Sequence, residues 1–324
     1  MADRLQTSMN SVKQKKFPLF LLVDDCAFPR INGDTGELIP FSAYETLLRL
    51  AEAFDICIPL CFTMRYLDLE GRWSGSTPIP YAKQLVELVK NNPQHLLFCD
   101  HGLTHKLGNT NYEFFNPDTG EHLNEQEHRK LLKIIIQIWD DLDLDFPEIM
   151  VPPSNSWVPN LTDRIYAEAG CRYIVSISHS KNQLLSRDLF SPGGIKKVFT
   201  PKFKWPDHSP HLTLLPRRSW LLSCNRINPS GWLLQQMMRS LAQPCSGPFA
   251  ALYNRTSLPL PVHSYMTHIG NFVGDHAFDF WYKLFHWADA HPSISLARSF
   301  DDARLLYDDL APKKEVLFDH DHLD

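Results

Sequence analysis

Apolar runs of strand length alternate with segments of helical periodicity over roughly the first 180 residues, and this alternation is the strongest constraint on the fold. The expected strands lie at residues 17–23, 56–63, 95–100, 148–151 and 172–177. The expected helices between them lie at residues 42–54, 81–90, 125–141 and 159–169. Repeated β-α units build parallel sheets, because a parallel strand is reached only through a crossover connection. We therefore expect an α/β protein whose parallel sheet is either open or closed into a barrel.

The second half of the chain has a less regular pattern. Proline and glycine interrupt residues 181–228, and a further strand is expected over residues 258–265. No internal repeat and no linker composition divides the sequence. We therefore expect one domain over residues 17–312, between a flexible N-terminus (1–16) and a C-terminal tail (313–324).

Composition limits the partners and the compartment. The net charge is −5 and the basic residues are scattered among acids, so the sequence lacks the basic patch of a nucleic-acid-binding protein. The seven cysteines are an odd number spread along the chain, as is typical of reduced thiols in a cytosolic protein. The apolar stretch 17–23 runs into two aspartates without a signal-peptide cleavage site, and no segment reaches the roughly 18 to 20 apolar residues of a membrane span. We expect a cytoplasmic protein with no membrane span and no nucleic-acid partner; nothing in the sequence indicates an oligomeric state.

Polar side chains follow several expected strands at their carboxyl ends. Asp24 and Asp25 end the first strand, and His101 and His105 begin the loop after the third. Functional groups gather at the carboxyl ends of parallel strands, and two adjacent carboxylates are costly to bury unless a cation pairs with them. If the loop makes a helical turn, the two imidazoles share a face and could hold one metal ion. We expect all four side chains at one rim of the sheet.

These motifs resemble those of the polysaccharide deacetylases, also called the NodB-homology or carbohydrate-esterase-four superfamily. The first motif of that family is an Asp-Asp pair, matched by Asp24-Asp25, and the second is H-x-x-x-H, matched by His101 and His105. The form H-G-x-T-H, followed by Glu113-Phe114, is most similar to a poorly characterised branch of the family. The P-P-S-N-S-W segment after the fourth strand also resembles that branch.

The resemblance implies an irregular (β/α) barrel of about seven parallel strands and a role for each motif residue. Asp25, His101 and His105 would bind a divalent metal, most often Zn²⁺, and Asp24 would be the general base. Two imidazoles and one carboxylate leave coordination positions for water and a substrate carbonyl. A neighbouring carboxylate that is not a ligand can take the proton of the attacking water. This division of labour would explain two adjacent aspartates.

The resemblance also implies a histidine general acid at the end of a late strand. Two residues are candidates, His263 and His268. We prefer His263, because it lies at the end of the expected strand and needs no loop excursion to face the metal. A structural, hydrogen-bonded histidine is the alternative for His263.

Four residues are candidates for contacts with the substrate: Glu113, Asn155, Trp157 and His268. Glu113 is either a polar group over the site or an exposed loop carboxylate. The arginine that orients the base in the family is absent from P-P-S-N-S-W, so Asn155 or Ser156 is the candidate for its place.

The sequence therefore predicts a metal-dependent deacetylase that hydrolyses an N- or O-acetyl group on a carbohydrate. A cytoplasmic glycan precursor for surface polysaccharide biosynthesis is the expected substrate. Two alternatives remain at this point: a non-catalytic metal- or carbohydrate-binding protein on the same fold, and a metal hydrolase acting on another C–N bond.

Overall fold

The computed structural model describes a core that extends from the first expected strand to just beyond the last helix. The described residues are 17–27, 38–64, 80–108, 110, 112–116, 119–176, 209–216, 219–220, 263–290 and 294–302. The expected flexible N-terminus and C-terminal tail lie outside these residues.

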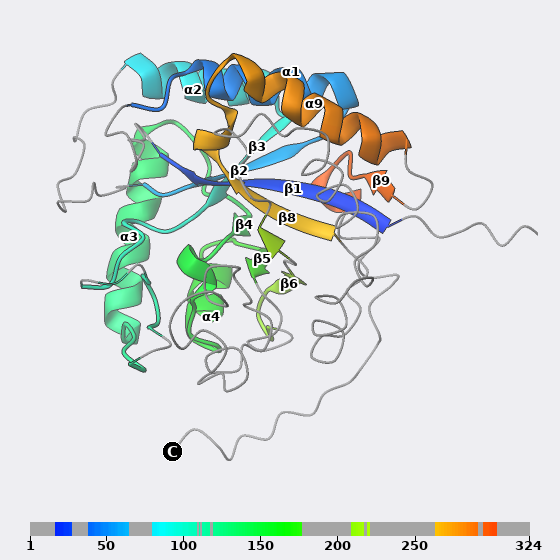
Figure 1. Ribbon diagram of the computed structural model, residues 1–324. Helices are drawn as coiled ribbons and strands as arrows, with labels where there is room; N and C mark the ends of the chain where they lie inside the picture. Colours follow the sequence, from blue (N-terminus) through cyan, green and yellow to red (C-terminus); the bar gives the residue numbers. More distant parts are fainter. Residues whose placement is uncertain are drawn as a thin grey trace, which may run out of the picture.

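Strands and helices alternate along this core as the sequence pattern predicts (Figure 1). The strands are β1 (Phe17–Cys26), β2 (Ile58–Phe62), β3 (Leu96–Asp100), β4 (Ile149–Met150), β5 (Tyr173–Ser176), β6 (Thr213–Pro216), β7 (Ser219–Trp220), β8 (His263–His268) and β9 (Ile294–Leu296). The α-helices are α1 (Ser42–Phe54), α2 (Pro80–Asn91), α3 (Glu125–Asp141), α4 (Thr162–Glu168) and α9 (Asp275–Ala290). Short 3₁₀ turns follow two strands, at Pro153–Asn155 and Ile269–Phe272. No helix within the described ranges has the length and apolar character needed to cross a membrane.

The described strands form one sheet in which every pair is parallel, in the order β6-β5-β4-β3-β2-β1-β8-β7, with β9 also paired to β1. The two ends of this order are close in the chain, because β6 ends at Pro216 and β7 begins at Ser219. Three Cα steps span at most about 11 Å, whereas the edges of a flat sheet of this order would lie about 34 Å apart. The sheet is therefore curled into an irregular barrel. With β6 and β7 counted as one segment, the described path has seven members, in agreement with the barrel of about seven strands that the family resemblance implies.

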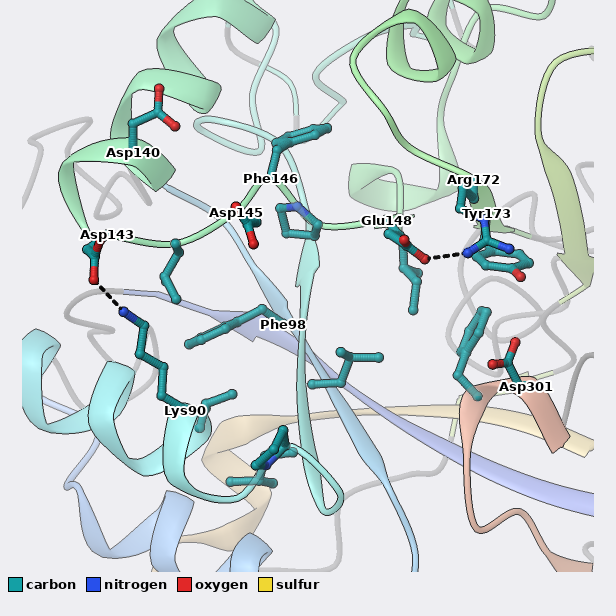
Figure 2. Close-up of a pocket in the computed structure, with 18 residues that line it drawn as sticks. Lys90, Phe98, Asp140, Asp143, Asp145, Phe146, Glu148, Arg172, Tyr173 and Asp301 are labelled. Carbon is teal, nitrogen blue, oxygen red and sulfur yellow. Dashed lines mark hydrogen bonds and ion pairs between the residues drawn. The ribbon is translucent and has the colours of Figure 1, made fainter.

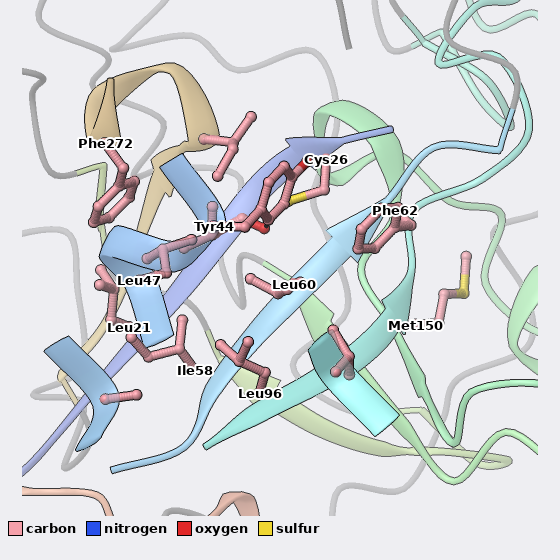
Figure 3. Close-up of a cluster of buried hydrophobic side chains, with 14 of the residues drawn as sticks. Leu21, Cys26, Tyr44, Leu47, Ile58, Leu60, Phe62, Leu96, Met150 and Phe272 are labelled. Atoms are coloured by element: carbon pink, nitrogen blue, oxygen red, sulfur yellow. Dashed lines mark hydrogen bonds between the residues drawn. The ribbon is translucent and has the colours of Figure 1, made fainter. Parts of the chain in front are cut away.

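Alternate residues of each strand face two different cores. Phe20 and Leu22 of β1 point into the barrel and pack with Cys61 of β2 and Cys99 of β3. Leu21 and Val23 point outward into a larger core between the sheet and its helices. Figure 3 shows this outer core, where Tyr44 and Leu47 of α1 lie over Leu60 and Phe62 of β2. A period of two in β1 thus separates the barrel interior from the helix layer, which explains why its whole run is apolar.

Helices cover the outer face of the curled sheet on two sides. Figure 1 shows α1, α2 and α9 together along one side, with α3 and α4 along another. The packing between α1 and α9 includes Phe54, whose ring lies 5.6 Å from that of Phe285. Helix α3 begins with a capping box, in which Asn124 accepts from Glu127 N and the Glu127 carboxylate accepts from Asn124 N. This cap fixes where the long loop after β3 ends.

Candidate metal centre

A bulge at the end of β1 turns two adjacent carboxylates toward the same side. Val23 pairs with Leu60 and Cys26 pairs with Phe62, so three steps along β1 match two along β2. Asp25, inside this bulge, has a φ of 55°, in the left-handed region. In a regular strand the side chains of Asp24 and Asp25 would face opposite sides of the sheet. The bulge instead brings both to His101, which is why this strand can end in two functional aspartates.

The two histidines of H-G-x-T-H come from the loop after β3. His101 Nε2 lies 2.8 Å from Asp24 Oδ1 and 3.7 Å from Asp25 Oδ1, and His105 Nε2 lies 3.6 Å from Asp25 Oδ1. The loop is not the helical turn that the spacing indicated, because Gly102 has a φ of 79° and His105 a φ of 63°. An irregular loop with two left-handed residues brings the imidazoles together instead, with ring centroids 5.0 Å apart.

The ligand atoms of Asp25, His101 and His105 lie within 4.8 Å of one another, so the structure brings together the three residues expected to bind metal. Two ligands about 2.1 Å from a tetrahedral zinc ion lie about 3.4 Å apart. The separations of 3.7 and 3.6 Å from Asp25 Oδ1 to the two imidazoles match this spacing. The 2.8 Å between Asp24 and His101 is a hydrogen-bond distance, shorter than the spacing of two ligands of a tetrahedral zinc ion. The two aspartates therefore differ in their distances to the imidazoles: Asp25 lies at ligand spacing, and Asp24 lies at hydrogen-bond distance.

The hydrogen bonding of His101 calls for a cation beside its other nitrogen. His101 Nδ1 is 2.5 Å from the backbone oxygen of Val151, which can only accept, so Nδ1 carries a proton. In the neutral ring, Nε2 therefore presents a lone pair to the carboxylates. Both His101 Nε2 and Asp24 Oδ1 are buried and lie 2.8 Å apart, so without a proton or a cation between them two lone pairs face each other. A proton or a metal ion relieves this repulsion, and an imidazole anchored through its other nitrogen is the usual form of a metal-binding histidine.

The charges of the cluster also favour a cation. Burial alone would raise the pKa of Asp24 and Asp25, but nearby imidazoles hold the pKa of both carboxyls below their usual range, His101 acting most on Asp24 and His268 on Asp25. Burial alone would lower the pKa of His101, but the charge of Asp24 raises it well above its usual value. Burial lowers the pKa of His105, so that ring is neutral near pH 7. In the metal-free cluster the proton on His101 therefore supplies the positive charge, and a metal ion bound to neutral imidazoles and ionised carboxylates would replace it.

His268, rather than His263, reaches the cluster. The expected strand over 258–265 is observed as β8, which begins at His263 and ends at His268. His263 pairs with Leu19, far back along β1, whereas His268 pairs with Asp24. His268 Nδ1 is 3.1 Å from Asp25 Oδ2, and its side chain is 44% exposed. The prediction that His263 stands at the carboxyl end of its strand is wrong, because pairing with β1 continues past the apolar run that defined the strand in the sequence.

Three of the expected substrate contacts lie elsewhere or are not described. Trp157 is 1% exposed and packs in the outer core, so its indole is not available to stack on a sugar. Glu113 is also 1% exposed and lies against the backbone of the histidine loop, neither over the site nor exposed. Asn155 lies in the turn Pro153–Asn155, but its side chain is outside the described part. Ser156 is buried and its hydroxyl donates to the Phe115 backbone oxygen, so it does not take the place of the absent arginine.

A separate pocket lies at the opposite end of the barrel (Figure 2). Its volume is about 860 Å³, and it is lined by Leu96, Ile149 and Tyr173, which begin or nearly begin β3, β4 and β5. Its two basic residues are paired, Lys90 with Asp143 at 2.8 Å and Arg172 with Glu148 at 3.0 Å. The pocket is therefore separate from the chemistry at the carboxyl ends of the strands.

Comparison with known proteins gives remote structural similarities. No family model and no curated protein matches the sequence. Among solved structures, 4-alpha-glucanotransferase from Thermococcus litoralis is 13% identical with a TM-score of 0.47, over 89% of this chain and 40% of that protein, so this chain spans less than half of its length. A putative polysaccharide deacetylase from Mycobacterium smegmatis is 11% identical with a TM-score of 0.46, over 87% of this chain and 82% of that one. A CE4 family pseudoenzyme from Bacillus anthracis is 8% identical with a TM-score of 0.45, over 90% of this chain and 66% of that one. At such identities and TM-scores, these similarities establish no activity for this chain.

Proposed function

We propose that this chain is a metal-dependent hydrolase that removes an acetyl group from nitrogen or oxygen on a carbohydrate. One observation carries the proposal: Asp25 stands at ligand spacing from two imidazoles, while Asp24 stands beside them at hydrogen-bond distance. Hydrolysis by this mechanism needs a ligand set and a separate carboxylate base. The resemblance of the Asp-Asp and H-G-x-T-H motifs to the polysaccharide deacetylases supports the acetyl group and the carbohydrate as the substrate class.

The ligand set would be Asp25, His101 and His105. When bound there, a divalent ion such as Zn²⁺ supplies Lewis acidity, which polarises an acyl carbonyl and lowers the pKa of water. His101 is held for this role by Val151, since the bond from Nδ1 keeps Nε2 directed at the carboxylates. His105 enters from the other end of the same loop. Zinc is the metal that we propose, because two imidazoles and one carboxylate form a donor set common in catalytic zinc sites.

Asp24 would be the general base. Nearby His101 holds its pKa below the usual range, so Asp24 is ionised near neutral pH and can accept a proton. It is 3% exposed and lies beside the proposed ligand set, within the reach that a general base needs toward a metal-bound water.

His268 is the better placed proton donor for the leaving amine or alcohol. Its ring is partly exposed at the rim and is tied to Asp25 through Nδ1. His268→Ala is expected to lower acetate release by about 100- to 10,000-fold while zinc binding persists, as loss of a general acid does. The matched variant His263→Ala should release acetate at the wild-type rate. A larger loss of rate in His263→Ala than in His268→Ala would refute this assignment.

A glycan precursor in the cytoplasm is the substrate we propose within this class. The odd number of cysteines, spread along the chain, supports a reducing compartment. A role in surface polysaccharide biosynthesis is an extension of the same proposal.

A non-catalytic metal- or carbohydrate-binding protein is the second candidate. The observation that favours it is that P-P-S-N-S-W lacks the arginine and that Ser156 is engaged with Phe115 instead of Asp24. Both candidates would use the same metal centre, but only the first would hydrolyse a substrate.

Metal analysis and acetate release together test the proposal. Purified wild type, Asp24→Asn and His101→Ala would be assayed for bound zinc and for acetate released from a panel of N- and O-acetylated sugars. We expect zinc and acetate release in wild type, zinc alone in Asp24→Asn, and neither in His101→Ala. Wild type that takes up no added zinc would refute the mechanism. Zinc-loaded wild type that is inactive on every sugar would favour the non-catalytic candidate.

A further inference from the structure

The histidine loop is held from behind by two carboxylates. Gly102 N donates to Asp100 Oδ2 at 3.1 Å. Leu103 N donates to both oxygens of Glu113, at 3.0 and 2.9 Å, and Thr104 N donates to Glu113 Oε1 at 2.8 Å. Consecutive N–H groups that converge on an anion form a backbone nest. Here the anion comes from the chain itself.

Glu113 is built into this nest. Its side chain is 1% exposed, and the Thr104 hydroxyl also lies 3.3 Å from its Oε1. The next residue, Phe114, is fully buried, and its ring stacks on His128 of α3 at 5.5 Å. Phe114 thus anchors the segment that carries Glu113 to the helix layer. The carboxylate is fixed by packing on one side and by backbone N–H groups on the other.

Gly102 leaves the space that Glu113 occupies. A Cβ at residue 102 would lie 1.8 Å from Glu113 Oε2 and 2.8 Å from Pro153 Cγ. The φ of Gly102 is also 79°, which a side chain rarely adopts. The glycine of H-G-x-T-H therefore meets two needs at once: the left-handed backbone and the approach of a carboxylate from a distant part of the loop. Thr104 contributes its N–H and hydroxyl to the same carboxylate.

We propose that Glu113 is a positioning residue, which fixes the backbone of residues 102–104 so that His101 and His105, at the two ends of that span, both face Asp25. Glu113 touches none of the three ligands in the described contacts; it acts through the backbone between two of them. The effect on metal binding rests on the proposed function, whereas the effect on the loop does not.

Amide hydrogen exchange of the metal-free protein tests the loop directly. Glu113→Ala removes both acceptors, and Glu113→Gln keeps the shape but sets an NH₂ donor against the loop amides. We expect exchange at Leu103 and Thr104 to quicken by about tenfold or more in Glu113→Gln, and further in Glu113→Ala, because their N–H groups lose acceptors. Glu121→Gln, an exposed residue further along the same loop, is the control and should exchange as wild type. If Glu113→Ala does not fold, Glu113→Gln decides.

Zinc affinity of the folded variants tests the consequence for the metal. Competition with a chelator should show zinc binding about 10- to 100-fold weaker in Glu113→Gln than in wild type, as for other residues that orient metal ligands. Unchanged exchange at residues 103 and 104 would overturn the inference, and so would faster exchange with unchanged zinc affinity. Wild type without zinc affinity would instead overturn the proposed function, and the exchange data would still decide the role of Glu113.

Discussion

Two pairs of buried carboxylates lie on opposite sides of the loop that carries His101 and His105. The inner pair, Asp24 and Asp25, faces imidazoles; the outer pair, Asp100 and Glu113, faces backbone N–H groups and the Tyr166 hydroxyl. All four side chains are nearly inaccessible to water. Burial raises the pKa of Asp100 to about 6 and that of Glu113 to about 7, and their hydrogen bonds offset this only in part.

The inner carboxylates behave in the opposite way. Burial acts on them too, but the imidazoles beside them hold the pKa of Asp24 and Asp25 below the usual range. The difference between the pairs comes from the partners, because an imidazole can carry a full positive charge whereas an amide offers only a dipole. One side of the loop thus attracts cations, and the other side organises the backbone.

Among the variants that test this comparison, His101→Ala should lose the most stability. In the metal-free protein, His101→Ala leaves the buried Asp24 without its imidazole, and loss of one partner of a buried pair costs about 3–5 kcal/mol. Urea unfolding at pH 7 measures the loss, and His211→Ala, an exposed histidine, is the control. A metal-free His101→Ala protein as stable as wild type would show that Asp24 does not depend on this partner.

Ionisation of the outer pair should make the free energy of unfolding depend on pH. The pKa of Glu113 in the folded protein, about 7, is above its ordinary value of 4.5. The folded state therefore holds this proton more tightly, so the contribution of Glu113 to stability is complete below pH 4.5 and is lost as the pH rises through 7. The expected loss is about 3 kcal/mol, from a shift of about two and a half units at about 1.4 kcal/mol each.

Glu113→Gln cannot ionise, so this loss should be missing from its unfolding free energy between pH 4.5 and 8. The inner aspartates, with lowered pKa values, lose their contribution only as the pH falls below about 4. Urea unfolding of metal-free wild type and variant across this range makes the comparison. If the unfolding free energies of wild type and Glu113→Gln change with pH in the same way, Glu113 does not ionise in this pH range in the folded protein.

A smaller effect should separate two glycines of the loop. Gly102 and Gly108 both have positive φ, 79° and 57°, but a Cβ at Gly108 would meet no atom within 4 Å. Gly108→Ala should cost about 1–2 kcal/mol for the left-handed backbone alone. Gly102→Ala should cost more by a further 1–3 kcal/mol or so, because it also displaces Glu113. Thermal unfolding of both variants measures the difference, and equal costs would mean that the carboxylate moves aside freely.

The β-α alternation was sufficient to predict a parallel sheet and the convergence of Asp24, Asp25, His101 and His105 at one rim, whereas closure of the sheet into a barrel was predicted only through the resemblance to the polysaccharide deacetylases. Parallel strands place their carboxyl ends at one rim, so side chains from distant strands meet there without knowledge of any contact. The bulge at Asp25 was not predictable, because it depends on the register between β1 and β2.

Two other errors have the same origin in tertiary contacts. The expected strand ended at residue 265, three residues before β8 ends at His268, because pairing with β1 extends the strand beyond its apolar run. Glu113 and Trp157 were candidates for substrate contacts, yet both side chains are buried, Glu113 against N–H groups of its own loop and Trp157 in the outer core. Composition of a polar loop does not reveal that one of its carboxylates turns inward onto a backbone nest.

The zinc affinities of Asp24→Asn and Asp25→Asn, measured side by side, test the central claim most directly. The two substitutions are chemically identical and lie at neighbouring positions. If Asp25 is the ligand and Asp24 the base, Asp25→Asn should weaken zinc binding by at least about 100-fold, whereas Asp24→Asn should change it by less than about tenfold. Equal losses in the two variants, or a greater loss in Asp24→Asn, would contradict the division of labour between the two aspartates.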